Sequence, residues 1–302
     1  MGNNGGMSAS APPADPAQRW AWAFPGLFVV LWGTGFIGAK LGLPYAEPAT
    51  FLSLRYLFVL AILVPLCWIG SAPWPATRAE TGHMAFAGML LQAGYLGGVF
   101  FSIHHGMPAG VSALIAGIQP ILTAVLSARM LGERTNLHQW IGLVLGVAGV
   151  ALVVREKYVF EGVDMAAVLL SVVALVSITL GTVWQKRFCP TVDLRTGAAI
   201  QFSAALLLLG PVALFVESHQ VRWTGEFIFA LGYLVVVLSL GAVLLLFWLI
   251  RHGAATKVAS LMYLVPPCTA LIAWPLFGET YTLFSAAGMA LAVIAVWLVT
   301  KG

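Results

Sequence analysis

Eight polar or aromatic side chains lie inside long apolar stretches of this sequence, and their types suit them to hold a small molecule. They are Trp32, Thr34, Gln92, Tyr95, Gln119, Trp184, Trp248 and Tyr263. Hydroxyl, amide and indole groups need hydrogen-bond partners in an apolar environment. Gln92 and Tyr95 share one helical face because they are three residues apart. Any one of these residues either joins neighbouring helices or contacts a solute; as a group, we predict that some line a solute pathway.

Arg55 is a charged residue inside an apolar stretch. It lies about seven residues into the segment 48–70, which is roughly 10 Å along a helix. A guanidinium at that depth must be paired or must reach the lipid headgroups. Two interpretations stay open: Arg55 binds a substrate carboxylate through two parallel hydrogen bonds, or it pairs with Glu47 or reaches the headgroups.

Pro120 and Pro266 also fall within apolar stretches. Proline removes a backbone donor and clashes with the carbonyl four residues earlier, here those of Ala116 and Met262. A carbonyl freed at membrane depth needs another partner. These prolines are therefore either hinges that face a substrate or tolerated packing kinks.

The elements that must position these residues are membrane-spanning helices. Of the 302 residues, 60% are apolar and 9% are charged, whereas soluble domains have roughly 25% charged residues. Crossing the hydrocarbon core takes roughly 20 apolar residues, which predicts ten spans, an all-α integral membrane fold. The spans lie near 21–39, 48–70, 83–103, 109–130, 137–154, 163–185, 196–216, 228–250, 256–277 and 281–300.

An internal repeat divides the chain into two halves. At an offset of 146 residues, Pro120 meets Pro266, Lys40 meets Lys186, and Gly132-Glu133 meets Gly278-Glu279. Five spans in each half is an odd number, so the second half is inverted relative to the first. Two inverted five-helix repeats are typical of secondary transporters, in which they open alternate sides of the membrane. We expect repeat 1 over 20–156, repeat 2 over 157–302, and a disordered tail over 1–19.

The distribution of basic residues predicts the topology. With the N-terminus inside, ten lysines and arginines fall in inside segments and four in outside loops, so both termini are expected in the cytoplasm. The basic residues form no stripe or patch, which argues against nucleic acid as a partner. The expected partners are the lipid bilayer, here a bacterial-type inner membrane, and a small-molecule solute.

The sequence resembles the drug/metabolite transporter superfamily, and within it the EamA-type permeases. The resemblance covers nearly everything after residue 20. It is carried by Trp32-Gly33-Thr34-Gly35-Phe36 through Lys40, Arg55, Gln119-Pro120, Leu131-Gly132-Glu133, the segment 260–267 (SLMYLVPP) and Phe277-Gly278-Glu279. It implies ten spans, cytoplasmic termini, and a central cavity lined mainly by spans 1, 3, 4, 6, 8 and 9.

The resemblance, together with the residues, predicts export or facilitated movement of small neutral or zwitterionic organic solutes such as amino acids and related metabolites. Glu133, Glu279 and the other carboxylates lie at span ends, so there is no counter-ion for a permanent cation and no buried acid typical of proton-coupled pumps. Proton-coupled drug efflux through such an edge carboxylate remains an alternative.

A membrane-embedded enzyme is a weaker alternative. The sequence has no HExxH motif, no paired intramembrane aspartates and no Gly-rich phosphate loop, so we predict no catalytic residues, no metal and no cofactor. Small residues four apart, such as Gly142 and Gly146, allow helices to approach closely. They are compatible with a monomer or with a homodimer.

Overall fold

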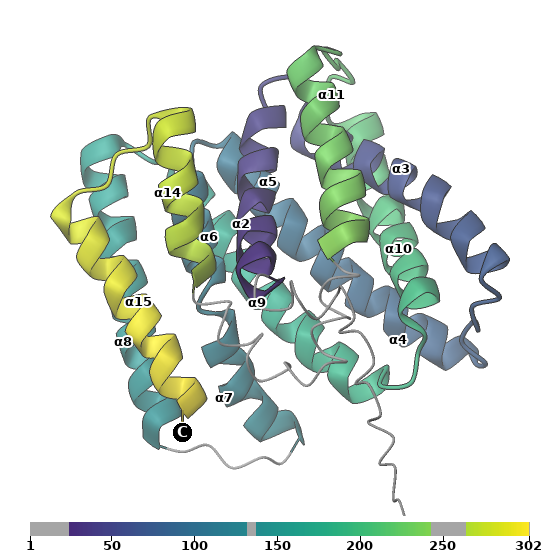
Figure 1. The fold of residues 1–302 in the computed structure, drawn as a ribbon, viewed down its shortest axis with the longest axis horizontal. Helices are drawn as coiled ribbons and strands as arrows, with labels where there is room; N and C mark the ends of the chain where they lie inside the picture. The colour runs from purple at the N-terminus through teal and green to yellow at the C-terminus, as the bar shows by residue number, and fades with distance from the viewer. Residues whose placement is uncertain (1–23, 132–136, 243–263, 302) are drawn as a thin grey trace, which may run out of the picture.

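The computed structural model describes residues 24–131, 137–242 and 264–301, and the regular elements in these ranges are all helices (Figure 1). In the first half they form five segments. These are α2 (Phe24–Gly42), α3 (Pro48–Ile69), the continuous series α4 (Arg78–Gly88), η1 (Met89–Leu96) and α5 (Gly97–His104), the pair α6 (Ala109–Ala116) and α7 (Gln119–Leu131), and α8 (Leu137–Glu161).

The second half repeats this order with five further segments. These are α9 (Met165–Phe188), α10 (Leu194–Phe215), α11 (Gly225–Gly232) continued by η2 (Tyr233–Ala242), α14 (Val265–Phe277) and α15 (Leu283–Lys301). Five helices in the described ranges are long and apolar enough to cross a membrane, and four shorter ones are also apolar. The predicted all-α membrane fold of ten segments in two inverted repeats is confirmed.

Some predicted span ends were wrong, because local capping and continued helix formation move them. The third segment begins at Arg78 rather than near 83, since Thr77 and Glu80 form a reciprocal capping box. Helix α8 continues to Glu161 rather than stopping near 154, and so crosses the expected repeat boundary at 156/157. Its last turns bury Glu156, whose carboxylate accepts a hydrogen bond from Ser285.

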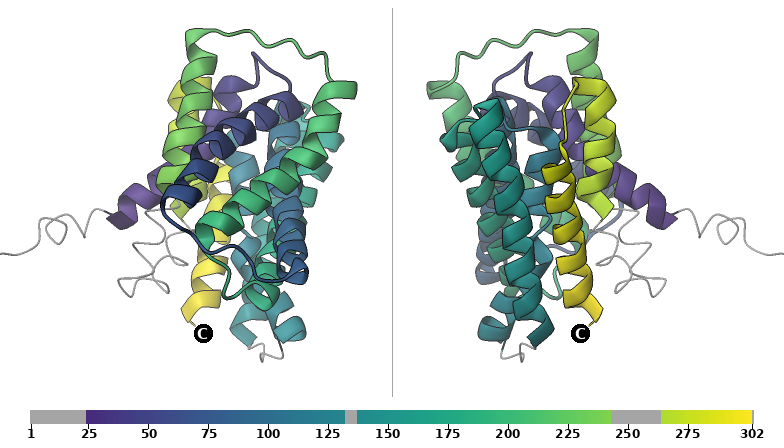
Figure 2. Two further views of the ribbon diagram at one scale, coloured as in Figure 1. Left: turned by 90° about the vertical axis from the view of Figure 1, so that its right-hand side faces the viewer. Right: turned by 90° about the vertical axis from the view of Figure 1, so that its left-hand side faces the viewer.

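The segments form two groups that meet at the middle of the molecule (Figures 1 and 2). Helices α8 and α15 lie side by side at one edge, and α3 and α10 lie side by side at the other. The α8–α15 contact is close because glycines face each other: the carbonyl oxygen of Gly149 lies 2.6 Å from where a Cβ on Gly288 would be. The predicted glycine spacing thus includes packing within one chain.

The end of the molecule where α2 ends and α3 begins is closed, and we call it the closed face. Phe51, Phe100 and Phe227 pack there with ring centroids 5.1–5.3 Å apart, and each is at most 1% exposed. Aromatic rings at such separations stabilise one another beyond the area that they bury. The three rings come from α3, α5 and α11, so they join both repeats.

Candidate functional site

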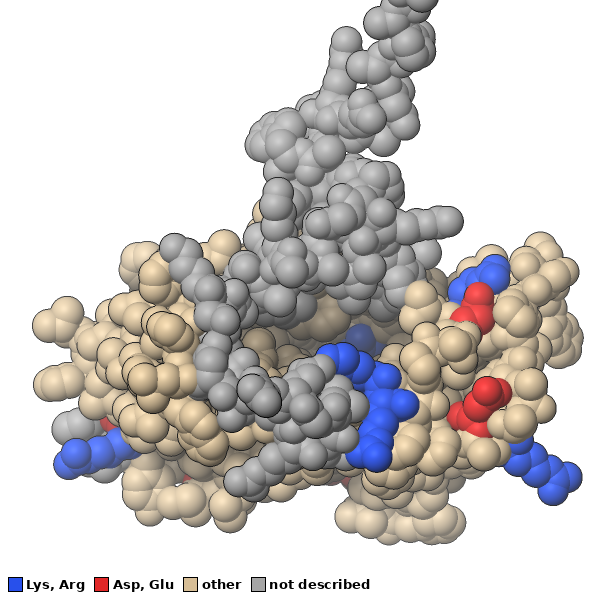
Figure 3. Space-filling view, turned by 90° about the horizontal axis from the view of Figure 1, so that it is seen from below, with Lys and Arg blue, Asp and Glu red and all other residues tan. Residues whose placement is uncertain are grey.

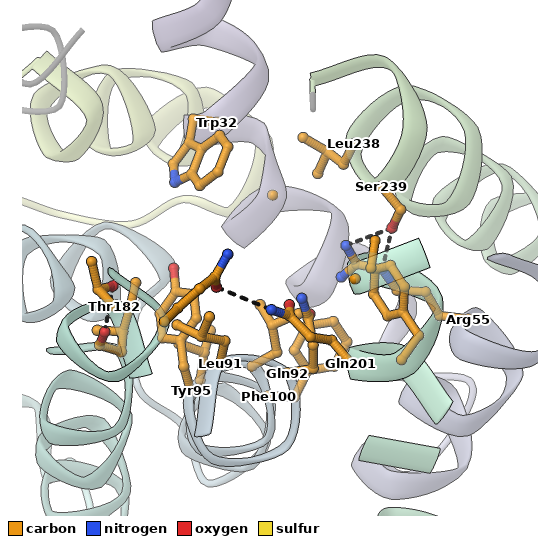
Figure 4. Close-up of a pocket in the computed structure, with 18 of the residues that line it drawn as sticks. Trp32, Arg55, Leu91, Gln92, Tyr95, Phe100, Thr182, Gln201, Leu238 and Ser239 are labelled. Atoms are coloured by element: carbon orange, nitrogen blue, oxygen red, sulfur yellow. Dashed lines mark hydrogen bonds between the residues drawn. The ribbon is translucent and has the colours of Figure 1, made fainter. Parts of the chain in front are cut away.

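A cavity of about 520 Å³ lies between the two repeats, beneath the closed face (Figure 4). Seen from the opposite end, the molecular surface is hollowed between its two sides (Figure 3). The lining combines apolar and aromatic side chains with amides, hydroxyls and one guanidinium. The lining residues are Trp32, Gly35, Phe36, Arg55, Met84, Leu91, Gln92, Tyr95, Leu96, Val99, Phe100, Gln119, Ile178, Thr182, Gln185, Leu194, Gly197, Ala198, Gln201, Phe202, Leu238 and Ser239. A mostly apolar pocket with a few convergent polar groups is typical of a small-molecule site.

Two π-helical segments contribute to this lining, one from each repeat. The offset of 146 residues carries η1 (89–96) onto 235–242, which lies within η2. Gln92 and Tyr95 come from η1, and Ser239 comes from η2. A π-helix is a costly irregularity that is retained mostly at functional sites. Its occurrence at matching positions indicates that both repeats shape the same cavity.

Amide side chains connect the helices around the cavity. Gln201 Nε2 donates to Gln185 Oε1 at 3.0 Å and to Met84 Sδ at 3.1 Å. Gln119 Nε2 donates to Thr182 Oγ1 at 3.3 Å. These bonds satisfy amide groups that would otherwise be costly in an apolar surrounding, and they leave other polar atoms of the same residues for a ligand.

Arg55 is 7% exposed and directs its guanidinium towards Ser239 (Figure 4). Its Nε and Nη2 atoms donate to Ser239 Oγ at 3.1 and 3.0 Å. Glu47, one of the predicted partners, instead accepts hydrogen bonds from the backbone and hydroxyl of Ser218, which hold the pKa of Glu47 below its ordinary value. The predicted pairing of Arg55 with Glu47 is therefore absent from the structure.

The structure gathers Trp32, Gln92, Tyr95, Gln119 and Arg55 around one cavity. Two other predicted pathway residues lie elsewhere. Thr34 hydrogen-bonds to the Tyr233 hydroxyl and so joins α2 to η2, and Trp184 packs in an aromatic cluster away from the cavity lining. The remaining two, Trp248 and Tyr263, lie outside the described residues.

The two predicted hinge prolines occupy the first turn of a helix. Pro120 follows a break at Gly117 and Ile118 that separates α6 from α7, and Pro266 is the second residue of α14. A proline at such a position costs no helical hydrogen bond, because those N–H groups have no partner within the helix. The expected clash of Pro120 with the Ala116 carbonyl is avoided because the chain is not helical at 117–118.

Sequence reasoning missed Ser239, Thr182 and Met84 as lining residues. A lone serine or threonine in an apolar helix usually bonds to its own backbone, and Thr182 does so with Ile178 O at 2.7 Å. No pattern in the sequence pointed to Ser239, because its place beside Arg55 depends on the packing of helices 184 residues apart in the chain. Within the described residues, no group of three or more His, Cys, Asp or Glu side chains could hold a metal ion.

Trp184 and Tyr95 provide a comparison between packing and lining positions. The centroid of the Trp184 ring lies 4.7 Å from that of Phe86 and 4.4 Å from that of Phe188. We expect Trp184→Ala to lose about 3 kcal/mol of stability, which a lower melting temperature in detergent would report. Tyr95→Ala should melt close to the wild type and change apparent solute affinity roughly two- to tenfold, since one aromatic contact to the solute is lost. The reverse assignment of the two effects would contradict this interpretation.

Comparison with known proteins assigns the chain to a family. The profile of the EamA-like transporter family matches residues 21–155 and again 165–301. The uncharacterized transporter YvbV of Bacillus subtilis is 32% identical, with 90% of this chain and 88% of that protein covered. The uncharacterized inner membrane transporter YedA of Escherichia coli is 25% identical, with the same coverage.

Two further comparisons bear on function and on fold. A protein of Salmonella typhimurium named "Probable amino-acid metabolite efflux pump" is 25% identical, with 90% of this chain and 92% of that protein covered. A solved crystal structure that is 18% identical superposes with a TM-score of 0.63, with 93% of this chain and 96% of that one covered, and so shows the same fold. On the evidence of the two profile matches and of these relatives, the chain is a membrane transporter and belongs to the EamA-like transporter family.

Proposed function

We propose that this transporter exports, or equilibrates, small neutral or zwitterionic organic solutes such as amino acids and related metabolites. The observation that carries the proposal is the cavity of about 520 Å³ between the two repeats, with its apolar walls and its few polar groups. Pockets of roughly 300–1,000 Å³ suit small organic molecules. The relative named as an amino-acid metabolite efflux pump supports the same class of solute.

The mechanism we propose is alternating access, with 20–156 and 157–302 as the two moving repeats. Contacts between the repeats close one face: Lys40 pairs with Glu279, and Glu217 accepts hydrogen bonds from the backbone of Ala49 and Thr50. Rearrangement of these contacts would open that face while the hollowed end closes. The proposed hinges are Pro120, which follows the break between α6 and α7, and Pro266, which lies in the first turn of α14.

The membrane orientation follows from the same proposal. We infer a bacterial inner membrane with both termini in the cytoplasm, which puts the closed face outside. A cysteine added after Gly302 and labelled from inside only would agree with this topology. Labelling of intact cells by an impermeant reagent would overturn it.

Flux in proteoliposomes tests the function. Vesicles that contain the purified protein and are loaded with a panel of labelled amino acids should release some of them faster than protein-free vesicles loaded in the same way. Release should continue when an ionophore collapses the proton gradient, provided that a solute gradient remains. Strict dependence on the proton gradient, abolished in Glu279→Gln, would instead support proton-coupled efflux, and chemical turnover without flux would support an enzyme.

A further inference from the structure

Arg55 is a buried cation with no opposite charge beside it in the described residues. The ion pairs found there do not include Arg55, and no Asp or Glu is present among the lining residues of the cavity. Burying an ionised group without an opposite charge is unfavourable. A guanidinium in the wall of this cavity is suited to bind an anionic group of a solute.

Ser239 fixes which edge of the guanidinium is available. Its hydroxyl oxygen accepts from Nε and Nη2 and donates to the Leu234 carbonyl at 2.9 Å, five residues earlier in η2. A guanidinium has five N–H donors in a planar fork. The edge formed by Nη1 and the second Nη2 proton has no protein acceptor in the described structure, and this edge binds carboxylates through two parallel bonds.

The surroundings of Arg55 favour a ligand with a single anionic end. Its counterpart in the repeat, Gln201, is neutral and lines the same cavity, so the two sides of the cavity differ in charge. The Nε2 atom of Gln201 donates to Gln185 and Met84, which leaves the amide oxygen of Gln201 as an acceptor for an ammonium group. Phe100 and Phe202 add apolar surface nearby.

We propose that the Nη1–Nη2 edge of Arg55 binds the carboxylate of the transported solute. The preferred solutes are monocarboxylates with an apolar side group, amino acids with apolar side chains first among them. This inference rests on the proposed transport function and deepens it, because it assigns the anchoring group. Ser239 is a positioning residue that holds the guanidinium in place.

Matched pairs of solutes test the proposal in the full-length protein. The probes are leucine, phenylalanine and methionine, each beside its amide, with 4-methylpentanoate as a carboxylate without an amine. Flux and thermal stabilisation are measured for the wild type, Arg55→Gln and Arg55→Lys. The control is Arg78→Gln, which removes an exposed arginine in the first turn of α4, outside the cavity lining.

The carboxylates should be recognised and the amides should not. Arg55→Gln should weaken carboxylate binding by about 10- to 100-fold, the usual effect of removing a hydrogen bond to a charged group, and Arg78→Gln should leave it unchanged. Arg55→Lys keeps the charge but loses the fork, so it should bind several-fold more weakly than the wild type. This second variant decides the question if Arg55→Gln does not fold.

Two results would overturn the assignment of Arg55: equal recognition of amides and carboxylates, or unchanged carboxylate affinity in both Arg55 variants. If no probe moves or stabilises the wild-type protein, the proposed transport of these solutes is itself wrong, and the carboxylate anchor fails with it. Movement of the amides alone would retain transport and reject the anchor.

Discussion

Replacing Glu279 with alanine is expected to destabilise the protein by about 3 kcal/mol, near the lower end for breaking a buried ion pair from one side, because the side chain of Glu279 is 4% exposed but that of Lys40 is 27% exposed. The Glu279 carboxylate accepts from Lys40 Nζ at 2.6 Å and from the backbone N–H of Ala109 at 2.7 Å. It also accepts from the Tyr281 hydroxyl. Glu279→Ala thus leaves an ammonium without its anion and removes the cap from the start of α6. Thermal unfolding in detergent should show a fall of roughly 10 °C.

Two other variants separate the contributions. Glu279→Gln keeps an oxygen for the Ala109 N–H but removes the charge, so its loss should be intermediate. Glu80→Ala removes a partly exposed carboxylate that accepts from the backbone N–H groups of Ala76 and Thr77 in the capping box of α4, and it should lower the stability by only about 1 kcal/mol. Melting temperatures that fall equally in Glu279→Ala and Glu80→Ala would show that the buried ion pair has no special weight.

The same carboxylate should make stability depend on pH. Glu279 lies in the connection between α14 and α15. Burial raises its pKa, but the hydrogen bonds from Lys40 and Tyr281 have the larger combined effect, so the pKa of Glu279 is below its ordinary value of 4.5. A carboxylate whose pKa is lowered by folding stabilises the folded state above its ordinary pKa and loses that contribution as the pH falls through the folded value. The difference in melting temperature between wild type and Glu279→Gln should therefore persist at neutral pH and shrink below about pH 4.5.

Gly288→Ala is expected to lower the free energy of unfolding by about 1–3 kcal/mol, although it adds only a single methyl group. A Cβ at Gly288 would lie 2.5 Å from Val153 Cγ2 and 2.6 Å from the Gly149 carbonyl oxygen. The backbone oxygen cannot rotate away as a side chain can, so α8 and α15 must separate. Gly288→Leu should be worse and should lower the yield of folded protein on size-exclusion chromatography.

Gly82 is the matched control, because it is a helical glycine with open space around it. No heavy atom lies within 4 Å of a Cβ built on Gly82 in α4. Gly82→Ala should therefore stabilise the protein by about 0.5–1 kcal/mol through the higher helix propensity of alanine. The changes in stability caused by Gly82→Ala and Gly288→Ala should have opposite signs. If both substitutions destabilise the protein, the effect of Gly288→Ala does not come from the α8–α15 contact.

The sequence was informative where the bilayer restricts the choices. Amides in apolar helices must face the interior of the bundle, which is why Gln92 and Gln119 could be grouped before their positions were known, whereas two interpretations of Arg55 stayed open. The repeat followed from prolines, glycines and charges at one offset. These patterns are local in the chain or depend on a simple count of spans.

Features that depend on contacts between distant helices could not be predicted. An indole suits either a cavity wall or a packed cluster, and Trp184 lies in a cluster because Phe86 and Phe188 meet it there. The π-helical segments follow no residue pattern, since they reflect an extra residue accommodated by packing. The partner of Arg55 was missed for the same reason: Ser239 is 184 residues away in the chain.

The carboxylates at the closed face also bear on how the chain is made. The starts of α3 and α6 in the first repeat are capped by Glu217 and Glu279, which come from the second. A helix start without such acceptors has orphan N–H groups. During synthesis the first five helices enter the bilayer before either carboxylate exists, so water or lipid headgroups must serve these helix ends in the meantime. The first repeat alone therefore has uncapped helix starts. They gain their carboxylate acceptors only after the second repeat has been synthesised and has packed against the first.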